Sequence, residues 1–204
     1  CRELALRKVT GRVTLATMLS VPACSVVIIT RNRQALLQLS VASVLAQGSS
    51  SLFELIVVDD ASTDGTRTWL NSLHDPRVRV LHRAECGGVA AARADGARAA
   101  KGELVAFTDD DCITSPTWLS ELLAPFVNQG VGAVYGRTVY VGEGYRGYFP
   151  ERLVTNSNGL WPAGGTIAYR RGVFNEVGYM DTFYARFNNE DTEFALRAIA
   201  AGFL

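Results

Sequence analysis

Three consecutive aspartates, Asp109, Asp110 and Asp111, end the mostly hydrophobic run 104–108. Adjacent carboxylates repel one another, so clustering them costs stability unless a positive group lies beside them. Mg²⁺ and Mn²⁺ bind carboxylate oxygens and keep coordination positions open for phosphate groups. The cluster therefore predicts a binding site for one of these cations, although an acidic turn without function has the same composition.

Two further pairs of acids, Asp59-Asp60 and Glu190-Asp191, lie where a carboxylate could act on a substrate. The first pair follows the run 53–58, where one carboxylate could bind a nucleobase or a ribose hydroxyl. These acids could instead only cap the next helix. The second pair begins the last predicted helix, where a carboxylate could remove a proton from a hydroxyl nucleophile. The helix dipole also favours acids there without any function.

Glycines and one arginine accompany these acids. Gly87-Gly88 opens an alanine-rich predicted helix, in which Arg93 could neutralise a nucleotide phosphate or be a solvated surface charge. Gly164-Gly165 precedes a short predicted strand. A glycine pair there would let a ligand approach the backbone closely, or would simply form a turn.

The elements that must position these residues alternate between strand and helix. The β-branched run 25–30 is typical of a strand covered on both faces, and three similar runs follow it, each after a helical pattern. This order predicts a parallel sheet with right-handed crossovers, in which ligands bind beyond the carboxyl ends of the strands. Thr30, Asp60 and the aspartate cluster fall at such ends, so we expect one site.

The second half of the sequence is less regular. Alternation over 131–141 predicts a long strand, and the segment 142–160 indicates a long loop that carries substrate-specific contacts. The pattern over 189–201 predicts a last helix whose inward face includes Ile199.

Length and composition are those of one globular domain, expected over 24–204 after a leader or tail over 1–23. Of the 204 residues, 48% are hydrophobic and 20% are charged. The formal net charge of zero gives no basis for binding nucleic acid or an anionic membrane surface.

Cysteine usage and hydropathy bear on location. The 4 scattered cysteines and 2 histidines disfavour a structural zinc site. No apolar run approaches the roughly 20 residues of a membrane helix. We therefore expect a cytoplasmic protein, which could lie at the inner face of a membrane only through segments beyond this sequence. Both ends look cut, which suggests a piece of a longer chain.

Five segments in this order resemble family 2 glycosyltransferases of the GT-A fold. They are 26–33 (VVIITRNR), 54–66 (ELIVVDDASTDGT), 91–97 (AARADGA), 101–111 (KGELVAFTDDD) and 189–197 (NEDTEFALR). The resemblance covers 24–204. It implies an α/β fold with a Rossmann-like, mostly parallel central sheet flanked by helices. It also implies an inverting transfer of a sugar from a nucleotide-activated donor to a hydroxyl acceptor.

The resemblance implies roles for residues on the donor side. The donor-binding residues by this match are Thr30, Arg31, Asp60, Arg93 and Asp110. Asp60 corresponds to the residue that binds the base. Asp111 is the expected ligand of Mn²⁺ or Mg²⁺, with Asp109 as a second ligand or an acid that only ends the strand.

The same match supplies the catalytic and acceptor residues. Asp191 corresponds to the general base, with Glu190 beside it. The acceptor-pocket residues by this match are Trp161, Gly164 and Gly165. The expected partners are a nucleotide-sugar, with UDP preferred, and a saccharide, lipid-linked or other hydroxyl acceptor.

The sequence departs from the family pattern at two places, since Asp95 and Thr166 stand where relatives often carry Asn. It also lacks the Gln-x-x-Arg-Trp motif of processive polysaccharide synthases, which favours transfer of single sugars.

Two other functions stay open. A sugar-phosphate nucleotidyltransferase uses a strand-end acid and Mg²⁺, but the loop 31–33 lacks the glycines it would need. The second open function is that of a non-catalytic or truncated GT-A binding module.

Overall fold

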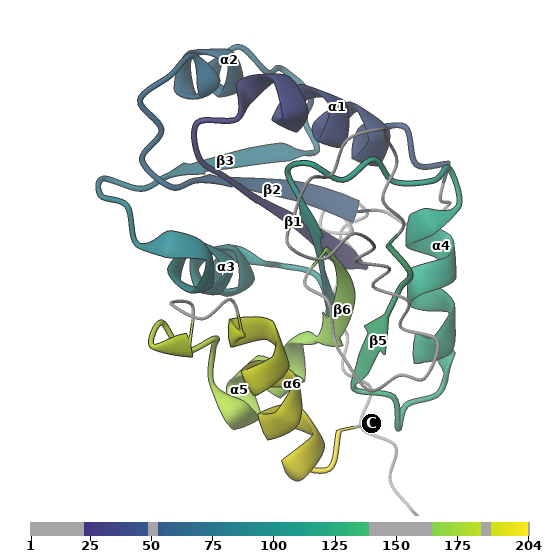
Figure 1. The fold of residues 1–204 in the computed structure, drawn as a ribbon. Helices are drawn as coiled ribbons and strands as arrows, with labels where there is room; N and C mark the ends of the chain where they lie inside the picture. The colour runs from purple at the N-terminus through teal and green to yellow at the C-terminus, as the bar shows by residue number, and fades with distance from the viewer. Residues whose placement is uncertain (1–22, 49–52, 139–164, 185–188, 204) are drawn as a thin grey trace, which may run out of the picture.

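A six-stranded sheet lies at the centre of the part of the chain that the computed structural model describes, residues 23–48, 53–138, 165–184 and 189–203 (Figure 1). Its strands are β1 (Cys24–Thr30), β2 (Phe53–Asp59), β3 (Val78–His82), β4 (Leu104–Asp109), β5 (Ala133–Tyr135) and β6 (Thr166–Arg170). Their order is β3-β2-β1-β4-β6-β5, and β6 runs antiparallel to both of its neighbours. The expected α/β fold with a mostly parallel sheet is confirmed.

Helices cover both faces of the sheet (Figure 1). One face carries α1 (Gln34–Leu45), α2 (Thr66–Asn71) and α4 (Trp118–Leu123), which continues into the short 3-10 helix η2 (Ala124–Val127). The other face carries α3 (Gly88–Ala99), α5 (Arg171–Val177) and α6 (Glu190–Ala200). Because successive strand residues point to opposite faces, each layer has its own hydrophobic cluster. Val26 and Ile28 belong to the cluster of α1, whereas Val27 belongs to that of α3.

Small residues let α3 approach the sheet closely. The alanines Ala90, Ala92 and Ala97 are buried against it. A Cβ added to Gly96 would overlap the Val27 side chain of β1. The short distance between this helix and the strands brings the arginine on α3 near the ends of the strands.

The pairing register places the polar residues at one edge of the sheet. In the parallel pairs, Thr30 of β1 is opposite Asp59 of β2, and Ile29 is opposite Asp109 of β4. The antiparallel strand β6 begins where β4 ends, because Thr108 pairs with Thr166. The carboxyl ends of β1, β2 and β4 and the start of β6 therefore meet at the same edge.

Two expectations for the second half differ from the structure. The strand expected over 131–141 is short, with only Ala133–Tyr135 in β5, and residues 139–141 lie outside the described part. Ile199 is 52% exposed, whereas Phe194 and Ala198 are buried. The buried face of α6 centres on those two residues, and Ile199 lies one position further around the helix.

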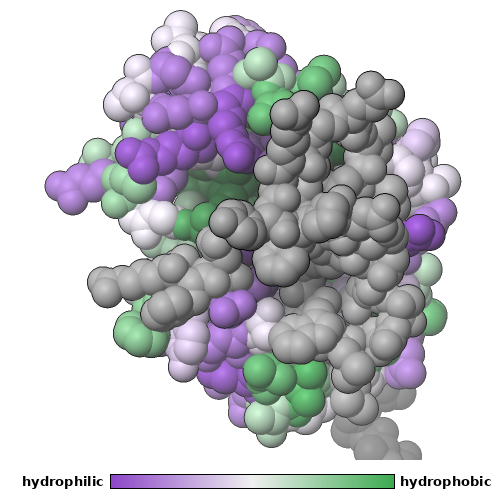
Figure 2. Space-filling model, in the orientation of Figure 1, coloured by the Kyte–Doolittle hydropathy of each residue, from purple (hydrophilic) through white to green (hydrophobic). Residues whose placement is uncertain are grey.

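The surface carries scattered hydrophobic residues. Figure 2 shows hydrophilic residues over α2, with hydrophobic ones gathered over α1 and α6. On α1, Leu36 and Leu39 are 44% and 56% exposed, and on α6 Leu196 is 60% exposed. Single exposed hydrophobic residues on outer helix faces are common and indicate no function by themselves. Within the described ranges, no helix is long and apolar enough to cross a membrane.

Candidate active site

The carboxylate of Asp110 is held at the end of β4 by the loop after β1. Thr30 Oγ1 donates a hydrogen bond to Asp110 Oδ2 over 2.7 Å, and Arg33 Nη1 donates to Oδ1 over 3.0 Å. Burial raises the pKa of Asp110, although these two hydrogen bonds oppose the shift. Arg33 Nη1 also lies 3.0 Å from Oδ2 of Asp111. The loop after β1 therefore contacts two of the three aspartates.

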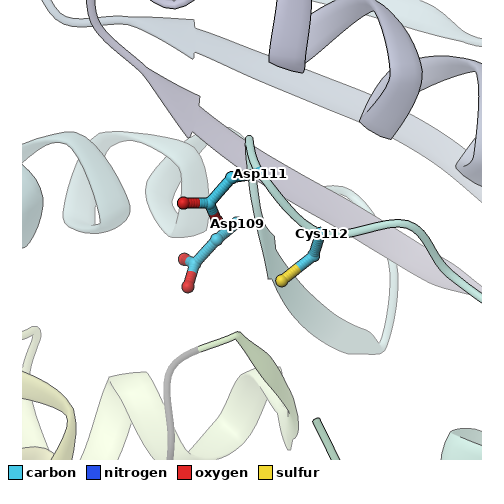
Figure 3. Close-up of side chains that lie close together, drawn as sticks. All are labelled: Asp109, Asp111 and Cys112. Atoms are coloured by element: carbon cyan, nitrogen blue, oxygen red, sulfur yellow. The ribbon is translucent and has the colours of Figure 1, made fainter. Parts of the chain in front are cut away.

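Asp109 and Asp111, with the thiol of Cys112, form a group that fits a metal ion (Figure 3). One ligand atom of each residue lies within 4.8 Å of the others. A Cβ added to Gly165 would lie only 3.2 Å from Asp109 Oδ2 and 3.5 Å from Cys112 Sγ, so the glycine at the start of β6 leaves this group uncrowded. The two carboxylates suit Mg²⁺ or Mn²⁺. Burial, with Asp109 adding to it, raises the pKa of Cys112 to about 11, so its sulfur is a protonated thiol.

Arg93 of α3 connects the aspartate cluster to the start of α6. Its side chain is only 7% exposed, and it pairs with Asp109 Oδ1 over 2.9 Å and with Glu190 Oε1 over 2.7 Å. Burial opposes the charge of this guanidinium, but Asp109, Glu190 and Asp191 together hold the pKa of Arg93 above its ordinary value. Residues from β4, α3 and α6 thus form one electrostatic group.

Glu190 and Asp191 begin α6 beside this group. Glu190 is buried, and burial raises the pKa of its carboxyl, with Arg93 opposing the shift. Its Oε2 atom is buried without a hydrogen-bond partner among the described residues. Asp191 is only partly buried, and its Oδ1 accepts a hydrogen bond from the backbone N–H of Thr192. The two acids therefore differ in environment, with Glu190 held inside and Asp191 more accessible to a substrate.

Asp60 organises the loop that leads into α3. Its carboxylate accepts hydrogen bonds over 2.9 Å from the backbone N–H groups of Gly87 and Gly88. Arg83 Nε pairs with the same carboxylate over 2.9 Å. The glycine pair thus supplies two hydrogen-bond donors to Asp60. Gly88 adopts a φ of 79°, in the left-handed region that favours glycine.

Arg33, Arg83 and Cys112 also contact the candidate residues, although the sequence pattern did not single them out. Arg83 directly follows β3 at the same edge of the sheet, and it also pairs with Asp95. Asp95 therefore supports the arginine that holds Asp60. Position after a strand end was the signal that could have identified Arg83 and Cys112.

The remaining predicted residues are placed as follows. Arg31 is exposed. Gly165 lies against the aspartate cluster, and Thr166 Oγ1 donates to the Gly165 carbonyl over 2.7 Å. Trp161 and Gly164 lie outside the described residues. Hydrogen bonds and ion pairs therefore join Thr30, Arg93 and Glu190 to the aspartate cluster, with Gly165 against it. Asp60 lies at the end of the neighbouring strand β2 with its own partners, Arg83 and the glycine pair.

The fold is that of GT-A transferases. The chain belongs to glycosyl transferase family 2, because the model of that family matches residues 25–193. This is the family that the five sequence segments predicted.

Individual relatives agree with this family. The chain is 41% identical over 108 residues to validoxylamine A glucosyltransferase of Streptomyces hygroscopicus subsp. jinggangensis, a match that covers 51% of this chain and 25% of the relative. It is 30% identical over 112 residues to the UDP-Glc:α-D-GlcNAc-diphosphoundecaprenol β-1,3-glucosyltransferase of Escherichia coli. This match covers 55% of this chain and 44% of the relative.

Among solved structures, a mannosyltransferase from Pyrobaculum calidifontis in complex with GDP-Man and Mn²⁺ is similar in fold. Its TM-score is 0.71 at 23% identity, and the match covers 89% of this chain and 53% of that one. The chain thus spans about half of that structure and a quarter to just under half of the two relatives above.

Proposed function

We propose that the chain is an inverting glycosyltransferase that moves a sugar from a nucleotide-diphosphate sugar, preferably a UDP-sugar, to a hydroxyl acceptor with the help of Mn²⁺ or Mg²⁺. The observation that carries the proposal is the double ion pair of Arg93. It joins Asp109 of the aspartate cluster to Glu190, directly beside Asp191. A donor site and a base candidate therefore share one edge of the sheet.

In this proposal the donor binds along the ends of β1, β2 and β4. Asp60 recognises the base, while Thr30 and Asp110 contact the ribose and diphosphate segment. Asp111 and Asp109 hold the divalent cation. When bound, the cation would offset the negative charge that develops on the leaving nucleoside diphosphate.

Asp191 then acts as the general base. Its carboxylate takes the proton of the acceptor hydroxyl as that oxygen attacks the anomeric carbon, so the nucleoside diphosphate leaves from the opposite face. Glu190 stays inside, fixed by Arg93, and orients the start of α6. One displacement with one base inverts the anomeric configuration, which distinguishes this mechanism from a double displacement.

The acceptor would enter beside Gly165, with Trp161 and Gly164 as further contacts. A lipid-linked saccharide is the acceptor we favour, because the name of the E. coli relative includes diphosphoundecaprenol. Such an acceptor would bring the protein to the inner face of a membrane. The mannosyltransferase complex supports Mn²⁺ as the cation, and the E. coli relative supports UDP as the nucleotide.

The substitution Asp191→Asn tests the proposal, because it keeps the shape of the side chain and removes its basicity. We expect nucleotide binding within about twofold of wild type, measured by calorimetry with UDP and Mn²⁺, and transfer reduced by at least about 10²–10⁴-fold. Asp75→Asn, at the opposite edge of the sheet beside Arg77, is the matched control. Normal turnover of Asp191→Asn, or a product with the donor's anomeric configuration by NMR, would overturn the mechanism.

A further inference from the structure

Arg33 lies on the aspartates that the proposed function assigns to the donor. Its Nη1 atom is 3.0 Å from Asp110 Oδ1 and 3.0 Å from Asp111 Oδ2. The side chain of Arg33 is 51% exposed, that of Asp111 is 45% exposed, and that of Asp110 is only 7% exposed. The guanidinium therefore approaches the pair from the solvent side.

The residue before Arg33 is fixed by hydrogen bonds to the loop after β2. Asn32 adopts a φ of 54°, in the left-handed region. Its N–H donates to Ser62 Oγ over 3.0 Å, and its Oδ1 accepts from the Thr63 N–H over 2.7 Å. The loop after β1 is thus tied to the loop after β2, with the Arg33 side chain extending from it.

A divalent cation at Asp111 and the guanidinium of Arg33 would require the same carboxylate. Mg²⁺ and Mn²⁺ bind carboxylate oxygens at about 2.0–2.2 Å and would repel a guanidinium in contact with that carboxylate. Arginine does not lose its proton in proteins, so the repulsion is relieved only by moving the side chain.

From this conflict, and resting on the proposed function, we infer that Arg33 is a positioning residue with two alternative partners. It competes with the divalent cation for Asp111, and it pairs with the diphosphate of the donor once the cation is bound. A planar guanidinium binds phosphate oxygens through two parallel hydrogen bonds, so the displaced side chain gains a partner of equal quality.

Formal charges are consistent with this exchange. The three aspartates, Glu190 and Asp191 with Arg33 and Arg93 sum to −3, since −5 + 2 = −3. A divalent cation changes the sum to −1, and a diphosphate diester of charge −2 returns it to −3. Without Arg33 the loaded site would carry −4, so the arginine opposes the cation alone but favours cation and diphosphate together.

The substitution Arg33→Ala should therefore move two affinities in opposite directions. Mn²⁺ binding to the chain without nucleotide, followed by the EPR signal of free Mn²⁺, should tighten by about two- to fivefold, the range expected for loss of a partly exposed ion pair. Binding of UDP at saturating Mn²⁺, measured by calorimetry, should weaken by about fivefold or more. Arg33→Lys keeps the charge and should give intermediate values.

Arg77→Ala is the matched control, because this side chain is 39% exposed and pairs with Asp75 before the start of β3, at the opposite edge of the sheet. It should change neither affinity. Unchanged or weaker Mn²⁺ binding by Arg33→Ala, or UDP binding equal to that of Arg77→Ala, would overturn the role of Arg33 while the proposed function stands. If wild type bound neither Mn²⁺ nor UDP, the metal-dependent donor site itself would be wrong, and this inference with it.

Discussion

Arg93 Nη1 donates a hydrogen bond to Glu190 Oε1 over 2.7 Å, across 97 positions of sequence. Both side chains are buried, at 7% and 6% exposure. Through Nη2, Arg93 also holds Asp109 over 2.9 Å. The pair fixes α6 to the end of β4 by way of α3, and the mutual position of the proposed metal acids and the proposed base depends on it.

Removing the guanidinium should destabilise the fold. Arg93→Ala leaves Glu190 buried and unpaired, which costs about 3–5 kcal/mol. Adding Glu190→Gln removes the uncompensated charge, so the double variant should be more stable than the sum of the two single effects by at least about 1 kcal/mol. Urea unfolding of the four proteins measures this coupling, and strictly additive effects would argue against the pair.

Loss of the Asp111 carboxylate should weaken metal binding. Mutating a residue that only orients a metal ligand already lowers metal affinity by about 10–100-fold. Asp111→Ala removes a proposed ligand itself, so it should reduce Mn²⁺ affinity by at least about tenfold. Glu121→Ala removes an exposed acid from α4 and is the control for net charge. Equal Mn²⁺ titrations for the two variants would remove Asp111 from the site.

A carboxylate at the opposite edge of the sheet should make stability depend on pH. Burial alone would raise the pKa of Glu54, but hydrogen bonds from Arg79, Ser25 and the Lys101 backbone hold it below its ordinary 4.5. A lowered folded-state pKa adds stability that is complete above the unfolded pKa and is lost as pH falls through the folded one.

Glu54→Gln should therefore lose about 1.5–3 kcal/mol at neutral pH, the usual size of a charge-assisted hydrogen bond. The deficit should shrink as pH falls below 4.5. Denaturant unfolding at several pH values measures it, with Glu103→Gln as control because that side chain is 75% exposed. A deficit that is constant with pH would exclude the ionised carboxylate as its cause.

Two glycines in helices should respond oppositely to alanine. Gly96→Ala would drive its Cβ into Val27 of β1, so we expect a loss of about 1–3 kcal/mol, as for other overpacked cores. Gly172 of α5 has no atom within 4 Å of an added Cβ, so Gly172→Ala should stabilise by about 0.5–1 kcal/mol. Thermal unfolding distinguishes the two, and stabilisation by both would contradict the close packing of α3.

Much of this protein follows from its sequence. Continuous hydrophobic runs, separated by helical patterns, predicted the strands and the mostly parallel sheet. Because parallel strands share a carboxyl edge, the same pattern predicted that Thr30, Asp60 and the aspartate cluster lie together. These are local signals, since each depends on a few neighbouring residues.

Side-chain partners were decided by the tertiary structure. After β1, Arg33 pairs with Asp110 and Asp111, whereas Arg31 is exposed, and Asn32 between them has a left-handed φ of 54°. Arg93 reaches Asp109 and Glu190 only because α3 packs closely on the sheet and α6 returns beside it. Sequence spacing fixes the strand end at which a residue lies. Which charged groups meet there depends on contacts between elements far apart in the chain. Hydrophobic periodicity does not predict those contacts.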